Sequence, residues 1–161
     1  MNKEYEYSFK VKDIKEFIQY CIDNQYEKKE EYLQNRILYK NGGPIMARIT
    51  ENIYNDRSKK ILNFKDDNLN DGALKISRES KDLVVNTDNQ EFVDSLIEIL
   101  DLTNKKVLKR KRFVFEKNNV KFEIDEYIEP IMNVVAIEGL KDEVDIVYRE
   151  LKQTINRNKV D

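Results

Sequence analysis

The 161-residue sequence contains no histidine and no tryptophan, and it has a single cysteine, Cys21. The missing histidine excludes every His-based catalytic triad, His-ligated metal site and His general base. One cysteine cannot form an internal disulfide, which is typical of proteins in the reducing cytoplasm. Cys21 lies on an apolar helical stripe, so we interpret it as a core residue. Any chemistry must therefore use carboxylates, Lys, Arg, Tyr or a bound metal ion.

The sequence also lacks a long apolar run and a clear excess of either charge. No segment approaches the length of a membrane span, and the charged N-terminus differs from a signal peptide, so we expect a cytoplasmic protein with no membrane partner. The 29 basic and 31 acidic residues give a net charge of −2, which provides no bulk attraction to nucleic acid. Hydrophobic residues make up 40 % of the chain, enough for one core. We predict one domain over residues 1–161, as a monomer or a homodimer.

Three segments have the apolar periodicity of helices: 13–24, 88–102 and 142–155. The first two begin with an acidic pair at the spacing of a capping box, namely Asp13 with Glu16, and Asp88 with Glu91.

Between these helices, the sequence alternates in segments bounded by turn residues. The expected strands are 4–11, 31–39, 46–52, 60–66, 74–80, 83–87, 106–116, 120–127 and 133–138. Turn residues at 41–44, 66–72 and 117–119 predict tight connections between neighbouring strands. This order of elements predicts an α+β domain built on one large antiparallel sheet or barrel.

The first expected strand shows how the charged residues are distributed. At a period of two, one face carries Tyr5, Tyr7, Phe9 and Val11, and the other carries Glu4, Glu6, Ser8 and Lys10. Later strands repeat the pattern, with cations and carboxylates on separate strands. An ordinary antiparallel sheet with one wet face explains such alternation. In a closed barrel, unpaired interior charges would cost several kcal/mol each, and a water-filled tunnel holding an anion and its cations would remove that cost.

The ordered set of charged strands resembles the CYTH family, also called the triphosphate tunnel enzymes, which includes class IV adenylyl cyclases and thiamine triphosphatase. The segments that carry the resemblance are Glu4-x-Glu6, Arg48, Leu62-Asn63-Phe64-Lys65, Arg78, Arg110-Lys111-Arg112 with Phe115, Phe122-Glu123-Ile124-Asp125 and Ile137-Glu138-Gly139. They span nearly the whole chain in the family's order. Three positions depart from the family pattern: Ser8 replaces a Lys, Thr50 replaces the second Arg of R-x-R, and Ala136 replaces the first Glu of E-x-E.

The resemblance implies an α+β fold in which an antiparallel β-barrel of about eight strands carries three main helices on its outside. It also implies metal-dependent hydrolysis of inorganic tripolyphosphate or of an organic or nucleoside triphosphate. The substrate-binding residues would be Arg48, Lys65, Arg78, Arg110 and Arg112. The ligands of Mg²⁺ or Mn²⁺ would be Glu4, Glu6, Glu123, Asp125 and Glu138. The residues closest to the reaction would be Glu6, Lys10 and Arg112.

Three alternatives share the same scaffold. The first is a class IV adenylyl cyclase, and the second is an RNA 5′-triphosphatase, for which the partner would be an RNA 5′ end. The third is a non-catalytic domain that binds nucleotides or polyphosphate. The basic segment 105–112 is also compatible with a nucleic-acid patch, but its interleaved Val107 and Leu108 favour a packed strand.

Overall fold

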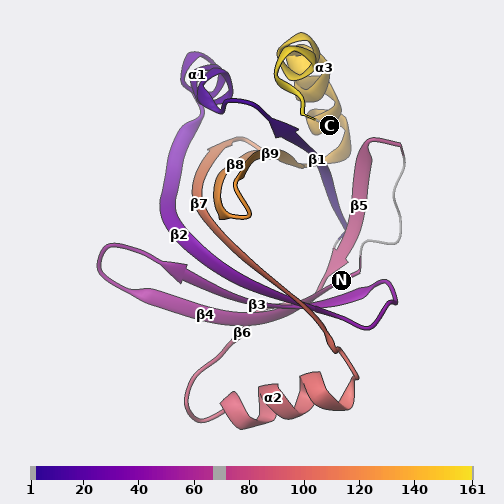
Figure 1. Cartoon of the computed structure of the whole chain (residues 1–161). Coiled ribbons are helices and arrows are strands. Elements are labelled where there is room, and N and C mark those ends of the chain that lie inside the picture. The colour runs from indigo at the N-terminus through magenta and orange to yellow at the C-terminus, as the bar shows by residue number, and fades with distance from the viewer. Residues whose placement is uncertain (1–2, 67–71, 161) are drawn as a thin grey trace.

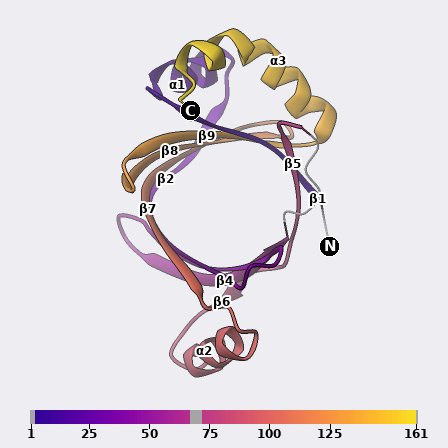
Figure 2. The same ribbon diagram turned by 45° about the vertical axis from the view of Figure 1, so that its right-hand side comes forward.

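In the computed structural model, which describes residues 3–66 and 72–160, an antiparallel sheet closes around a central space (Figures 1 and 2). Its described strands are β1 (Lys3–Val11), β2 (Glu27–Lys40), β3 (Ile45–Ile53), β4 (Ser58–Asp66), β5 (Leu74–Glu79), β6 (Leu83–Val84), β7 (Asn104–Lys117), β8 (Val120–Glu129) and β9 (Met132–Gly139). Their order is β3-β2-β7-β8-β9-β1-β5-β4-β6, and a further pairing of β3 with β4 closes the sheet. Eight described strands therefore form a barrel, and the short β6 lies beside β4.

The helices pack on the outside of this barrel. In Figure 2, α1 (Lys15–Asp23) and α3 (Lys141–Asn158) lie together over β1, β8 and β9, and α2 (Gln90–Ile99) lies on the opposite side below β4 and β6. No helix within the described residues is long and apolar enough to cross a membrane.

The apolar core lies between the sheet and the helices, not inside the barrel. Phe122 and Ile137 point outward from β8 and β9 and form one buried cluster with Phe17 of α1 and Val144 of α3. A second cluster joins β3 and β4 to Val93 of α2. Because side chains alternate along a strand, an outward apolar face leaves the polar residues of the same strands pointing into the barrel.

The predicted fold class is confirmed: the structure has an eight-stranded antiparallel barrel with three helices outside it among the described residues. The connections predicted at 41–44 and 117–119 join β2 to β3 and β7 to β8. Most of the connection predicted at 66–72 lies outside the described residues.

The predicted capping boxes are wrong. The N-caps of α1 and α2 are Ile14 and Asn89, and within the described structure neither side chain caps its helix. Asp13 instead accepts a hydrogen bond from the Lys15 backbone N–H at 2.9 Å, which is a local turn before the helix.

Gly139, at the end of β9, is required by close packing against β8. A Cβ at this position would lie 2.0 Å from the Asn119 carbonyl oxygen, and the φ angle of +153° is one that side-chain-bearing residues rarely adopt. Gly139 directly follows Glu138, so this contact also fixes the end of the strand that carries a predicted metal ligand.

We expect Gly139→Ala to destabilise the protein by about 1–3 kcal/mol, because the backbone must move to accept the methyl group. Thermal unfolding measures this change. Gly43→Ala is the matched control, since its new Cβ would meet only the Asn41 side chain, at 3.2 Å. Equal losses of stability in the two variants would contradict the packing argument.

Candidate functional site: a polarised cavity inside the barrel

The barrel encloses a cavity of about 330 Å³ that is lined almost entirely by polar and charged side chains. All eight barrel strands contribute to the lining. The charges on the barrel strands separate into a basic and an acidic half. Asp82, in the segment between β5 and β6, also lines the cavity and accepts a hydrogen bond from Asn63 of β4.

The basic half consists of four adjacent strands, β4, β3, β2 and β7. Their charged side chains in the lining are all cationic: Lys65, Arg48, Arg36, Arg110 and Arg112. The acidic half consists of the other four strands, β8, β9, β1 and β5. It contributes one cation, Lys121, among the described residues, and its carboxylates are Glu4, Glu6, Glu79, Glu123, Asp125 and Glu138.

Ion pairs form where the two halves meet. At the β7–β8 junction, Arg112 donates two parallel hydrogen bonds to Asp125, of 2.8 and 2.9 Å, and a third to Glu123 at 2.7 Å. Arg110 lies 3.3 Å from Asp125, and the two side chains are only 5 % and 3 % exposed. This bidentate geometry provides close partners for charges that have lost most of their water.

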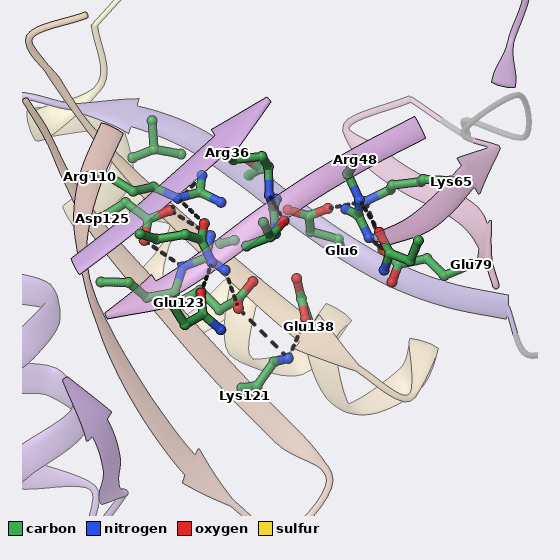
Figure 3. A pocket seen from close by; sticks show the side chains of 18 of the residues that line it. Glu6, Arg36, Arg48, Lys65, Glu79, Arg110, Lys121, Glu123, Asp125 and Glu138 are labelled. Carbon is green, nitrogen blue, oxygen red and sulfur yellow. Dashed lines mark hydrogen bonds and ion pairs between the residues drawn. The ribbon is translucent and has the colours of Figure 1, made fainter. Parts of the chain in front are cut away.

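The second junction, between β4 and β5, is built around Glu79. Its carboxylate lies 2.9 Å from Arg48 and 3.5 Å from Lys65, and Lys65 also lies 3.8 Å from Glu6 (Figure 3). Burial raises the pKa of Glu79, but attraction to Arg48 and Lys65 outweighs it and holds the pKa below its usual value.

Arg36 and Arg110, in the basic half, keep guanidinium nitrogens that no carboxylate among the described residues satisfies. The Nε of Arg36 donates to Thr50 Oγ1 at 2.9 Å, and no carboxylate among the described residues lies within ion-pair distance of Arg36. Arg110 donates through Nε to Gln34 at 2.7 Å and through Nη1 to Tyr127. Its Nη2 is buried without a hydrogen-bond partner among the described residues. A buried donor without a partner points to a missing acceptor.

In the centre of the acidic half, carboxylates have too little positive charge around them. Burial and repulsion from Glu123 raise the pKa of Glu138 well above its usual value, although Lys121 lies 3.0 Å from Glu138. Burial and the adjacent Glu79 raise the pKa of Glu4 to about 7. These carboxylates are short of positive charge.

Comparison with solved structures places this barrel among known folds. The PH1012 protein of Pyrococcus horikoshii superposes with a TM-score of 0.74 at 19 % identity, over 92 % of this chain and 90 % of that one. HpAC1 from Hippeastrum, an adenylyl cyclase candidate described as having a dominant triphosphatase activity, gives 0.62 at 15 % identity, over 96 % and 87 %. This chain has the CYTH fold.

Other comparisons show that this structural similarity does not determine the activity. A chain of the Schizosaccharomyces pombe Mediator head module superposes with a TM-score of 0.67 at 8 % identity, over 99 % of both chains. No protein-family model matches the sequence, and no curated protein matches it significantly. The structural similarity therefore shows the CYTH fold, and the activity depends on the residues of the cavity.

Most of the site residues expected from the sequence lie together in the CYTH cavity. The lining includes Glu4, Glu6, Arg48, Lys65, Arg110, Arg112, Glu123, Asp125 and Glu138. Two expected residues lie elsewhere. Lys10 is exposed near the end of β1, beyond the lining, and Arg78 is about half exposed and pairs with Asp66. Register explains Arg78: Lys65 and Glu79 are directly opposite and share the inner face, so Asp66 and Arg78 share the outer one.

Four charged residues of the cavity are not among those expected from the sequence: Arg36, Glu79, Asp82 and Lys121. Glu79 and Lys121 lie on the same face of their strands as other lining residues. On these strands, Arg78 and Glu123 were predicted as site residues instead. Arg36 stands in a strand where Leu33, Asn35 and Ile37 give only weak alternation, so its direction needed the register with β3.

The donor set of the acidic half fits a hard divalent cation. Glu6 and Glu138 are directly opposite each other on β1 and β9. The pKa values of Glu4 and Glu138 are raised despite nearby lysines, so further positive charge would stabilise both carboxylates. No three acidic residues in the described part of the chain are already gathered as a metal cage. Binding would therefore draw side chains together.

The pKa of Glu4, about 7, predicts how stability depends on pH. A raised carboxyl pKa contributes stability that is present below its usual value and is lost as the pH rises through about 7. We therefore expect Glu4→Gln to raise the melting temperature of the metal-free protein at pH 8 and to change it less at pH 5. Glu98→Gln, on the exposed face of α2, is the control. The same effect at both pH values would contradict the assignment of a raised pKa to Glu4.

Proposed function

We propose that the protein binds a triphosphate inside the barrel and hydrolyses it with the help of Mg²⁺ or Mn²⁺. The observation that carries this proposal is the division of the cavity into a basic and an acidic half. A triphosphate carries roughly four negative charges and needs cationic donors along its length. The basic half offers them on adjacent strands.

The free donors of the basic half support an anionic ligand. Arg110 keeps a buried Nη2 that its own chain does not satisfy, while its Nε and Nη1 are held by Gln34 and Tyr127. The orientation of the guanidinium is thus fixed, and its Nη2 edge has no hydrogen-bond acceptor among the described residues. Phosphate oxygens are acceptors that match such an edge.

The size and polarity of the cavity favour the phosphate chain over an organic group. Its volume of about 330 Å³ is at the low end for small-molecule sites, and such sites are usually lined mainly by apolar residues. Here the aromatic lining is limited to Tyr32 and Tyr127. We therefore propose inorganic tripolyphosphate, or the triphosphate end of a larger molecule whose remainder stays outside the cavity.

In hydrolysis, Arg48, Lys65, Arg110 and Arg112 would hold the phosphate oxygens and stabilise the charge that develops on them. Glu4, Glu6 and Glu138, with Glu123 beside them, would hold the metal ion. A bound Mg²⁺ or Mn²⁺ would supply charge stabilisation and a more acidic water molecule. The closed wall of the barrel limits the water that can compete with these contacts.

A second candidate is a domain that binds triphosphate without turnover. It is favoured by the position of Lys10, because the first strand brings no amine into the cavity, and by Ser8 in the place of the family's Lys.

The decisive experiment incubates the protein with tripolyphosphate, thiamine triphosphate, ATP and an RNA 5′-triphosphate, each with Mg²⁺ and with Mn²⁺. Phosphate, pyrophosphate and cyclic AMP are measured separately. We expect orthophosphate, fastest from tripolyphosphate. Pyrophosphate with cyclic AMP would indicate a cyclase instead, and binding without any product would indicate the second candidate.

We expect Glu6→Gln to eliminate turnover and to leave tripolyphosphate binding measurable, because Glu6 belongs to the acidic half and the basic half stays intact. Phosphate release and isothermal titration give the two measurements. Glu126→Gln, exposed on the outer side of β8, is the matched control and should behave as wild type. Full activity in Glu6→Gln would mean that the metal does not bind at the first strand.

A further inference from the structure

Arg36 occupies the centre of the basic half, on β2. Figure 3 shows it between two groups of paired charges: Arg110 and Asp125 on one side, and Arg48 and Glu79 on the other. We propose that Arg36 is a phosphate-binding residue that takes the place of the arginine absent at position 50, and that Thr50 positions it. The inference rests on the proposed function, because it assigns a residue to the same ligand.

The register of β2 and β3 places the two residues together. Arg36 and Thr50 are directly opposite in the antiparallel ladder, so their side chains share the inner face with Cβ atoms about 5 Å apart. Thr50 is 2 % exposed and accepts a hydrogen bond of 2.9 Å from Arg36 Nε. A guanidinium has five N–H donors, and this bond uses one of them. The bond orients the group and leaves its Nη atoms available.

Arg36 differs from the other cations of the cavity in having no carboxylate partner. Arg48 and Lys65 reach Glu79, Arg110 and Arg112 reach Asp125, and Lys121 reaches Glu138, all within 4 Å. Arg36 has no such contact among the described residues. Burial and three like charges, Arg110, Arg48 and Arg112, lower the pKa of Arg36, and the attraction of Glu123, beyond ion-pair distance, opposes them only in part.

An arginine stays protonated inside a protein, so this arrangement leaves a positive charge that opposes folding of the empty barrel. A residue that served only the fold would be expected to have an acidic partner. An anion bound between Arg36 and Arg110 would satisfy both at once.

Thr50 allows the arginine on β2 to extend into the cavity. A small hydroxyl side chain leaves space across the ladder and supplies an acceptor for Nε, whereas an arginine at position 50 would place a second cation directly opposite Arg36. The cationic member of this cross-strand pair therefore lies on β2 and not on β3. This shift moves the phosphate contact toward Arg110, on the far side of β2.

The test measures the melting temperature of Arg36→Gln with and without tripolyphosphate, together with the Kd by titration. We expect the free variant to melt at a higher temperature than the wild type, because an unpaired like charge is removed. We expect its tripolyphosphate-dependent rise to shrink and its Kd to increase at least about tenfold, the loss typical of one hydrogen bond to a charged group. A purely structural arginine would give a lower melting temperature.

Two further variants separate the roles. Arg78→Gln removes an exposed arginine from the outer face and should leave the Kd unchanged. The exchange Arg36→Thr with Thr50→Arg returns the charge to β3 and should recover most of the affinity lost in Arg36→Thr alone.

The outcomes distinguish the two proposals. A wild-type protein that does not respond to tripolyphosphate would overturn the proposed function and the Arg36 assignment together. A wild-type response that is unchanged in Arg36→Gln would overturn the assignment alone. A free Arg36→Gln protein that melts below the wild type would also overturn it, since Arg36 would then support the fold.

Discussion

The separation of like charges into two contiguous halves of one closed sheet is the constraint on which this structure depends. Burying charges is expensive, and the barrel offsets that cost mainly at its two junctions, where Arg112 meets Asp125 and Arg48 meets Glu79. Within the acidic half, Lys121 pairs with Glu138. Between the junctions, the basic half keeps free donors and the acidic half keeps crowded carboxylates. Because the interior is polar, the apolar faces of the strands must be covered from outside, and α1, α2 and α3 do this.

Strand alternation predicted one antiparallel sheet or barrel, and the family resemblance implied the closed barrel, whereas the direction of several charged side chains was not predicted. Glu4 and Glu6 were assigned to the inner face because their strand alternates strictly with apolar residues. Arg78 was placed in the site by the resemblance, although it has the parity of the apolar Leu74 and Ile76 on its strand. The pairing of β4 with β5 puts it on the outer face. The helix starts were misjudged for a similar reason: Glu16, expected in a capping box, instead contacts Arg157 of α3.

The fold by itself does not decide the activity. HpAC1, with its dominant triphosphatase activity, and a chain of the Mediator head module both share this barrel with the present chain. What distinguishes a triphosphate site is the set of charges inside. In this chain, the cavity keeps a charged side chain beside two of the positions that depart from the family pattern. Glu123 of β8 lies directly opposite Ala136, and Arg36 of β2 lies directly opposite Thr50.

The most direct test of a triphosphate site is a crystal structure of the protein grown with tripolyphosphate and Mn²⁺, whose anomalous scattering locates the metal. We expect a phosphate chain inside the barrel with an oxygen at hydrogen-bond distance from Arg110 Nη2, and manganese on the side of Glu6 and Glu138. Tripolyphosphate bound only on the outer face of β7, near Lys109 and Lys111, with none in the cavity, would contradict it.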